Sequence, residues 1–141
     1  MSSVFETPAN QAVDKIAQAL ESNDNIAIPN WYGTVKGGAH KERVPENPKL
    51  WYKRAAAVLR TLATGRKVGV RRLQHKFGGR KEHKVRTPHH VKEGGKSIRV
   101  AFQQLEKAGF VQKEKTGGRT ITPAGASFVE KACGGSEKQA E

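Results

Sequence analysis

Apolar residues recur at the spacing of an α-helix in several separate stretches of the chain, and most stretches have a recognisable start or stop. The first predicted helix opens at Thr7-Pro8, because Thr can cap free amide groups and Pro is favoured at the first helical position. The second opens at Asn47-Pro48, and the third covers residues 70–77 and ends at Gly78-Gly79. The positions of these helices expected to face a common core are Val13, Ile16, Leu20, Trp51, Ala55, Val58, Leu59, Leu62, Val70, Leu73 and Phe77.

The rest of the pattern adds two helices and some β character. Ser97 is expected to cap a helix over residues 98–108, and Thr122-Pro123 is expected to open the last one. Two short β runs around Thr116-Gly117-Gly118 predict a hairpin, and "KVGV" at 67–70 allows one short strand. The order helix, short strand, helix, helix, hairpin is typical of a winged helix-turn-helix. We therefore expect a mainly α fold, a five-helix bundle around such a core, in one domain over residues 1–133.

Residues 78–96 lie between the third and fourth predicted helices and contain few apolar side chains. These nineteen residues exceed the length that ordered loops usually reach. They cannot bury enough apolar area to offset the entropy lost on ordering, so we expect a basic loop that is mobile until a partner fixes it. The tail, residues 134–141, is expected to be disordered.

Charge divides the chain into three parts. Residues 1–30 carry one Lys against four acidic residues (−3), residues 31–99 carry nineteen Lys and Arg against four (+15), and residues 100–141 carry six against five (+1), which sums to the net +13. Such a block of like charge repels itself unless a partner neutralises it, and nucleic acid carries enough negative charge to do so.

We expect no membrane partner, because no run approaches 18 apolar residues and no segment pairs a basic face with a broad apolar one. The start lacks the pattern of a secretory signal, and the single Cys133 suits a reducing compartment.

Metal binding and catalysis are both disfavoured by the residue pattern. His83, His89 and His90 share one loop, but no cysteine is near them and no pair has the spacing of a zinc finger. The basic region offers only scattered carboxylates, and no GxxxxGK[ST] phosphate loop occurs. We expect no enzyme activity, no metal and no cofactor.

Nucleic-acid binding leaves two candidates open, DNA and RNA. A winged-helix transcription regulator reads bases with the helix that spans 97–108 here, yet its only cations are Arg99 and Lys107, although Gln103 and Gln104 suit adenine. The positive charge lies instead on the second and third helices and on the long loop, which suits broad phosphate contact with folded RNA. Three aromatic residues near these segments either stack on bases or complete the core, namely Trp31, Tyr32 and Tyr52. A DNA-reading regulator would be a dimer, whereas no helix for dimerisation is visible, so we expect a monomer.

Four blocks of the chain carry a resemblance to a known family. They are "WYKRAAAVLRTL" (51–62), "VGVRRLQHKFGGR" (68–80), "IRVAFQQLEKAGFV" (98–111) and "GGRTITPAGASFVEKA" (117–132), with "HKERVPENP" before the first. In this order they resemble the ribosomal protein S19e family of archaeal and eukaryotic small ribosomal subunits. The last two blocks alone would be weak, because many winged-helix regulators end in a similar way. One departure is Val100, where the family pattern leads us to expect a second basic residue after Arg99.

The resemblance implies a helical bundle around a winged-helix core, located in the head of the small subunit and bound to rRNA. It also implies a role in late maturation of the small-subunit rRNA, neighbouring ribosomal proteins as partners, and a ribosome-bound cytoplasmic location. Arg54, Arg60, Arg99 and Gly118-Arg119 match family positions, and Gly78-Gly79, Pro88 and His90 fit the loop pattern. From the resemblance and the charge together, the expected RNA-binding residues are Lys53, Arg54, Arg60, Arg71, Arg72, Lys76, Gly79, Arg80, Lys81, Lys84, Arg86, His90, Arg99, Gly118 and Arg119.

Overall fold

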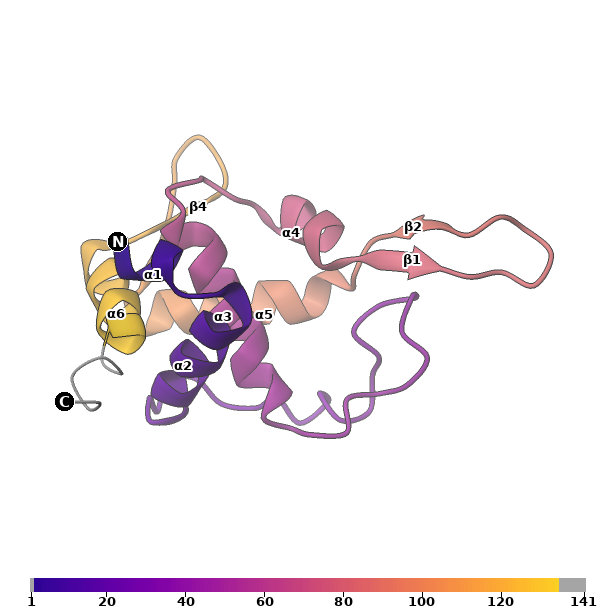
Figure 1. The fold of residues 1–141 in the computed structure, drawn as a ribbon, viewed down its shortest axis with the longest axis horizontal. Helices are drawn as coiled ribbons and strands as arrows, with labels where there is room; N and C mark the ends of the chain where they lie inside the picture. Colours follow the sequence, from indigo (N-terminus) through magenta and orange to yellow (C-terminus); the bar gives the residue numbers. More distant parts are fainter. Residues whose placement is uncertain (1, 135–141) are drawn as a thin grey trace.

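The computed structural model describes residues 2–134, and within this range the chain forms six helices and two small antiparallel sheets (Figure 1). The helices are α1 (Ser2–Glu6), α2 (Ala9–Glu21), α3 (Leu50–Ala63), α4 (Val70–Phe77), α5 (Gly95–Lys107) and α6 (Pro123–Gly134). The strands are β1 (Gly79–Lys81), β2 (His89–Val91), β3 (Val111–Lys113) and β4 (Arg119–Ile121). None of the helices over residues 2–134 combines the length and the apolar character needed to cross a membrane.

The predicted winged-helix core is confirmed. It consists of α3, α4, α5 and the β3–β4 hairpin, which is the wing. The expected strand at 67–70 is one residue wide, because Val68 exchanges both backbone hydrogen bonds with Arg119 of β4, at 3.1 and 2.9 Å. Gly109 ends the α5 region with φ +85°, a left-handed conformation that suits glycine at the end of a helix.

The core is built from the apolar stripes that the helical spacing predicted. α2 packs on α3, α1 and α2 pack on α6, and α3 and α4 pack against α5. Trp51 and Leu59 of α3, Phe102 and Leu105 of α5 and Ile16 of α2 are fully buried. Burial of each such side chain contributes roughly 1.5–3 kcal/mol, which is why these helices form in this arrangement.

The helices differ from the prediction in two ways, an additional helix and a shifted boundary. Helix α1 was not predicted from the sequence, and α5 begins at Gly95 rather than after Ser97, which is buried inside it. Gly94 precedes α5 in an extended conformation and donates its backbone N–H to the carbonyl of Gly37 at 2.9 Å. The start of α5 is therefore fixed by a contact with a distant loop, which local sequence does not reveal.

The segment expected to be a loop over 78–96 contains regular structure, because β1 and β2 pair within it and α5 begins at Gly95. The register joins Gly79 to Val91, Arg80 to His90 and Lys81 to His89. Backbone hydrogen bonds need no apolar side chains, so a pattern poor in apolar residues still forms a ladder. Figure 1 shows this hairpin extending away from the helical body; its mobility in solution stays a prediction. Of the expected disordered tail, Gly134 belongs to α6 and residues 135–141 lie outside the described range.

Aromatic residues of the connector between α2 and α3 complete the core. The rings of Trp31 and Tyr32 lie 6.0 and 5.3 Å from that of Trp51, in edge-to-face arrangements. The indole N–H of Trp51 donates to Gln104 Oε1 at 2.9 Å, and Gln104 Nε2 donates to the carbonyl of Ala27 at 2.8 Å. Trp31 and Tyr32 thus pack against the core while remaining partly exposed, and Gln104 is engaged inside the protein rather than free to read a base.

Candidate nucleic-acid interface

The two predicted cations in the first turns of α3 have different surroundings. Lys53 is half-exposed and pairs with Asp14 of α2 at 3.1 Å, and such an exposed pair stabilises a fold very little. Arg54 points to the other side, where its guanidinium forms an ion pair with Glu93 and lies 4.6 Å above the centre of the Phe77 ring. The Arg54 side chain is 24% exposed and that of Glu93 is 1% exposed. Arg54 is therefore a residue of the fold as well as of the surface.

Glu93 connects four parts of the molecule. Its backbone N–H donates to the carbonyl of Gln74 in α4 at 2.9 Å, and its own carbonyl accepts from Gln74 Nε2 at 3.1 Å. It also forms a β-bridge with Gly38 of the connector, while its carboxylate holds Arg54 of α3. Burial raises the pKa of the Glu93 carboxyl, although the nearby Arg54 charge acts to lower it. The root of the hairpin, the connector, α3 and α4 thus meet at one residue, Glu93, through its backbone and its buried carboxylate.

Helix α4 and the end of α3 present a second group of predicted cations. Arg71 and Arg72 are exposed on α4. Lys76 donates to Thr61 Oγ1 of α3 at 2.9 Å, and burial together with neighbouring guanidinium groups lowers the pKa of its ammonium. Arg60 is half-buried, and its Nε is enclosed without a hydrogen-bond partner among residues 2–134. These four cations lie on the two helices on which the sequence placed them, and the hydrogen bond between Lys76 and Thr61 joins these helices.

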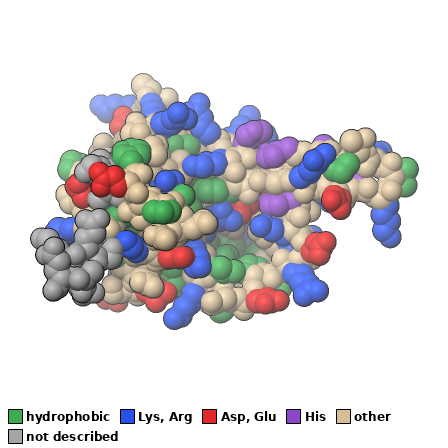
Figure 2. Space-filling view, viewed as in Figure 1, with side chains coloured by type: hydrophobic (Ala, Val, Ile, Leu, Met, Phe, Trp, Pro, Cys, Tyr) green, Lys and Arg blue, Asp and Glu red, His purple; other side chains and the backbone are tan. Residues whose placement is uncertain are grey.

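The hairpin carries the third group. Arg80, Lys84 and Arg86 are exposed, and Lys81 is half-buried in β1. Figure 2 shows histidine side chains gathered where α4 meets the hairpin, with Lys and Arg side chains beside them. Two ring pairs form there, His75 with His90 at 4.5 Å and His83 with His89 at 4.8 Å between centroids. Over the described residues 2–134, no three His, Cys, Asp or Glu side chains are grouped so as to hold a metal ion.

His40 of the connector packs against the root of the hairpin. A Cβ on Gly79 would lie 2.7 Å from His40 Cδ2, so this position has no room for a larger residue. Burial, followed by the charges of Lys41, Arg54 and His90, lowers the pKa of the His40 imidazole. Gly79, expected to approach RNA, therefore also has a structural reason to be glycine.

Of the predicted cations of α5 and the wing, one is exposed and one is tied into the fold, as for Lys53 and Arg54 of α3. Arg99 is exposed on α5. Arg119 Nε donates to Glu106 Oε1 at 2.5 Å and its guanidinium lies 4.6 Å above the centre of the Phe102 ring, so it is tied into the core. Gly118 precedes it with φ +77°, a conformation that glycine tolerates in a tight wing turn.

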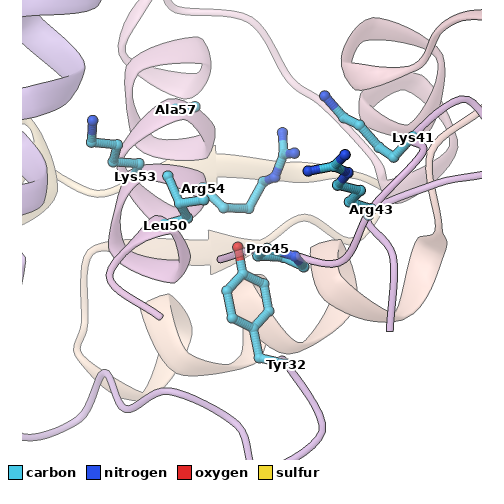
Figure 3. Close-up of a pocket in the computed structure, with 9 residues that line it drawn as sticks. Tyr32, Lys41, Arg43, Pro45, Leu50, Lys53, Arg54 and Ala57 are labelled. Carbon is cyan, nitrogen blue, oxygen red and sulfur yellow. The ribbon is translucent and has the colours of Figure 1, made fainter. Parts of the chain in front are cut away.

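Sequence reasoning missed one part of the surface, the basic connector between α2 and α3. Lys41 and Arg43 are exposed there and line a cavity of about 360 Å³ together with α3 (Figure 3). Lys41 also lines a second hollow, which reaches Arg80 and Lys81 of β1. The connector therefore continues the basic surface from α3 to the hairpin. The "HKERVPENP" segment was the sequence feature that could have indicated this part of the surface. It lies outside any predicted helix, so helical periodicity could not assign its charges to a face.

These observations define a class of protein, a small, strongly basic protein with a winged-helix-like core, a second basic hairpin and extra terminal helices. Residues 3–138 match the family described as "Ribosomal protein S19e". The chain is 33% identical over 138 residues to the small ribosomal subunit protein eS19 of Haloarcula marismortui, covering 95% of this chain and 90% of that protein. It is 37% identical over 132 residues to eS19 of Aeropyrum pernix (92% and 86% covered) and 37% identical over 129 residues to eS19B of Schizosaccharomyces pombe (92% and 90% covered). The chain belongs to the ribosomal protein S19e family, as the four sequence blocks indicated.

Proposed function

We propose that this protein is a structural constituent of the small ribosomal subunit and binds small-subunit rRNA in the head region. Its relatives are named as small ribosomal subunit proteins. In this proposal the protein is a monomer when free, and in the cytoplasm it is bound to ribosomes, with rRNA and neighbouring small-subunit proteins as partners. It has no enzyme activity, and it supports late assembly of the subunit and maturation of its rRNA.

One observation carries the rRNA-binding part of the proposal, which is the +15 charge of residues 31–99. The elements that hold this charge adjoin one another, because Glu93 joins the connector, α3, α4 and the hairpin. A surface of this kind neutralises phosphates of several RNA strands at once and so lets them pack closely. The exposed cations best placed for this role are Arg71, Arg72, Arg80, Lys84 and Arg86.

The mechanism predicts a steep dependence of binding on salt. If about six phosphates are engaged, log K should fall with log salt at a slope of roughly −4 to −5. Binding of the purified protein to a transcript of the small-subunit head, measured from about 50 to 200 mM KCl, tests this. A slope near zero would exclude phosphate neutralisation. In a sucrose gradient of a lysate, the chain should travel with small subunits and dissociate only in high salt.

The alternative, a winged-helix transcription regulator, predicts a different result in the same assay. The exposed side of α5 carries Arg99, Gln103 and Lys107, but Gln104 is engaged by Trp51 and Ala27. A regulator would prefer one duplex DNA sequence over others and bind it as a dimer. We expect no such preference and a monomer on sizing.

A further inference from the structure

The cavity between α3 and the connector has the features of a binding site for a small anionic group. Its α3 wall is formed by Leu50, Lys53, Arg54 and Ala57, which share one stripe of the helix at spacings of three and four residues. This stripe lies opposite the core-facing side of α3 and lines the cavity. The volume of about 360 Å³ lies at the small end of the range for ligand pockets.

The connector supplies the opposite wall and two of the four lining cations. This side is lined by Tyr32, Gly37, Lys41, Arg43 and Pro45. Together with α3 it brings four cations to the cavity, and no carboxylate lines it among the described residues 2–134. Figure 3 shows the Lys41, Arg43 and Arg54 side chains reaching toward the space above the Tyr32 hydroxyl. The wall is held in place because Gly94 donates its N–H to the Gly37 carbonyl at 2.9 Å.

Arg54 is held in a single position for binding an anion. Its guanidinium is fixed from one side by the Glu93 carboxylate and from another by the Phe77 ring, and it still lines the cavity. A guanidinium has five N–H donors, so those not given to Glu93 Oε1 can donate to a ligand oxygen. Because the side chain is already ordered, binding costs less conformational entropy than it would for a free Arg.

The remaining lining is suited to a ring rather than to a second charge. Tyr32, Pro45 and the 37% exposed Leu50 present apolar surface beside the cations. Burial raises the pKa of the Tyr32 phenol, so at neutral pH it is a neutral hydroxyl that can donate a hydrogen bond. A phosphate joined to a sugar and a flat base meets both requirements, while a double helix is too wide to enter.

We propose that this cavity binds one unpaired nucleotide of the bound RNA, with its phosphate against Arg43 and Arg54 and its base over Tyr32 and Pro45. This inference rests on the proposed function, because it names which part of the RNA enters the surface. It also gives the connector a role beyond linking α2 to α3.

The test titrates the intact, isotope-labelled protein with each of the four ribonucleoside 5′-monophosphates and, separately, with inorganic phosphate. Amide signals of Gly37, Lys41 and Ala57 should shift. At least one nucleotide should bind about tenfold or more tightly than phosphate, because base burial adds to the charge contact. Equal affinities would show an adventitious ion only, and an absence of shifts at these amides would also overturn the proposal.

Matched variants separate this inference from general RNA binding. Arg43→Gln should weaken nucleotide binding about tenfold or more, whereas Arg86→Gln at the hairpin tip removes the same charge and should leave it unchanged. Both positions are exposed, and thermal melting checks that each variant is folded. If the two variants bind nucleotide equally, the cavity assignment is wrong even when both bind rRNA less tightly. If rRNA binding by the unchanged protein did not depend on salt, the proposed function would be refuted instead.

Discussion

Replacing Arg54 with Met should destabilise the protein strongly, although Arg54 lies in the middle of the proposed RNA surface. The change keeps much of the apolar length of the side chain but leaves the Glu93 carboxylate, 1% exposed, without its cation. Removal of one partner of a buried ion pair typically costs 3–5 kcal/mol. We expect about 3 kcal/mol, the lower end, because Arg54 itself is partly exposed. In a chain of this size the midpoint of thermal unfolding should fall by roughly 10 °C.

The same variant should have a distinct pH dependence. Burial already raises the pKa of Glu93 above its value in the unfolded chain, and loss of Arg54 removes the charge that acts to lower it. Between the unfolded and folded pKa values the folded state binds more protons, so stability rises as the pH falls through this window. The difference in the free energy of unfolding between Arg54→Met and the wild type should therefore shrink as the pH is lowered from 7.5 toward 5. A second variant, Glu93→Gln, should remove this dependence.

Urea unfolding followed by circular dichroism at pH 7.5 and pH 5 measures both effects. The control is Lys53→Met, the neighbouring position on α3, whose pair with Asp14 is half-exposed and should be worth less than about 1 kcal/mol. Should Arg54→Met cost no more than Lys53→Met, or should its deficit stay constant with pH, the structural role assigned to Arg54 would be wrong. The result also decides how RNA-binding data are interpreted, because a variant that unfolds says nothing about phosphate contact.

Two further predictions concern close packing and titration. Gly125→Ala in α6 should cost about 1–3 kcal/mol in chemical unfolding, because its Cβ would lie 2.3 Å from the Phe110 carbonyl oxygen. For Gly134→Ala the added Cβ meets no atom of the described residues within 4 Å, so the change should be neutral or slightly stabilising, and equal effects of the two changes would contradict the packing. Burial lowers the pKa of His40, so its contribution to stability is present above pH 6.5 and is lost as the pH falls below it. His40→Gln should therefore flatten the pH dependence of the melting temperature between pH 7 and 5.5, and an unchanged slope would refute the assignment.

Local patterns in the sequence predicted the helical part of the fold well. The apolar stripes of α2, α3, α4 and α5 depend on neighbours three and four residues apart, which the sequence shows directly. The β3–β4 wing was found for a similar reason, since its turn is marked by Gly117-Gly118, both at positive φ. The Gly78-Gly79 stop of α4 and the Thr122-Pro123 start of α6 are equally local, and Thr122 Oγ1 accepts from the Gly125 N–H at 3.1 Å.

Features that depend on distant contacts were missed. The β1–β2 ladder joins residues up to twelve positions apart through backbone groups, which leave no mark on the apolar pattern. The start of α5 depends on Gly37, far away in the connector. The role of Arg54 depends on Glu93, 39 positions later, and nothing in the α3 sequence distinguishes Arg54 from the exposed Lys53 beside it.

Acidic residues inside a basic segment indicate which of its cations the fold uses. Residues 31–99 hold four carboxylates, of which Glu42, Glu46 and Glu82 are exposed and Glu93 is buried. An exposed carboxylate only weakens the local potential, whereas a buried one must be paired, so it uses part of the charge and hydrogen-bonding capacity of one arginine inside the fold. Glu106 does the same to Arg119 in the wing. It follows that total positive charge overstates the number of phosphates this protein can neutralise, and that substitutions of its unpaired cations are the ones that report on RNA binding.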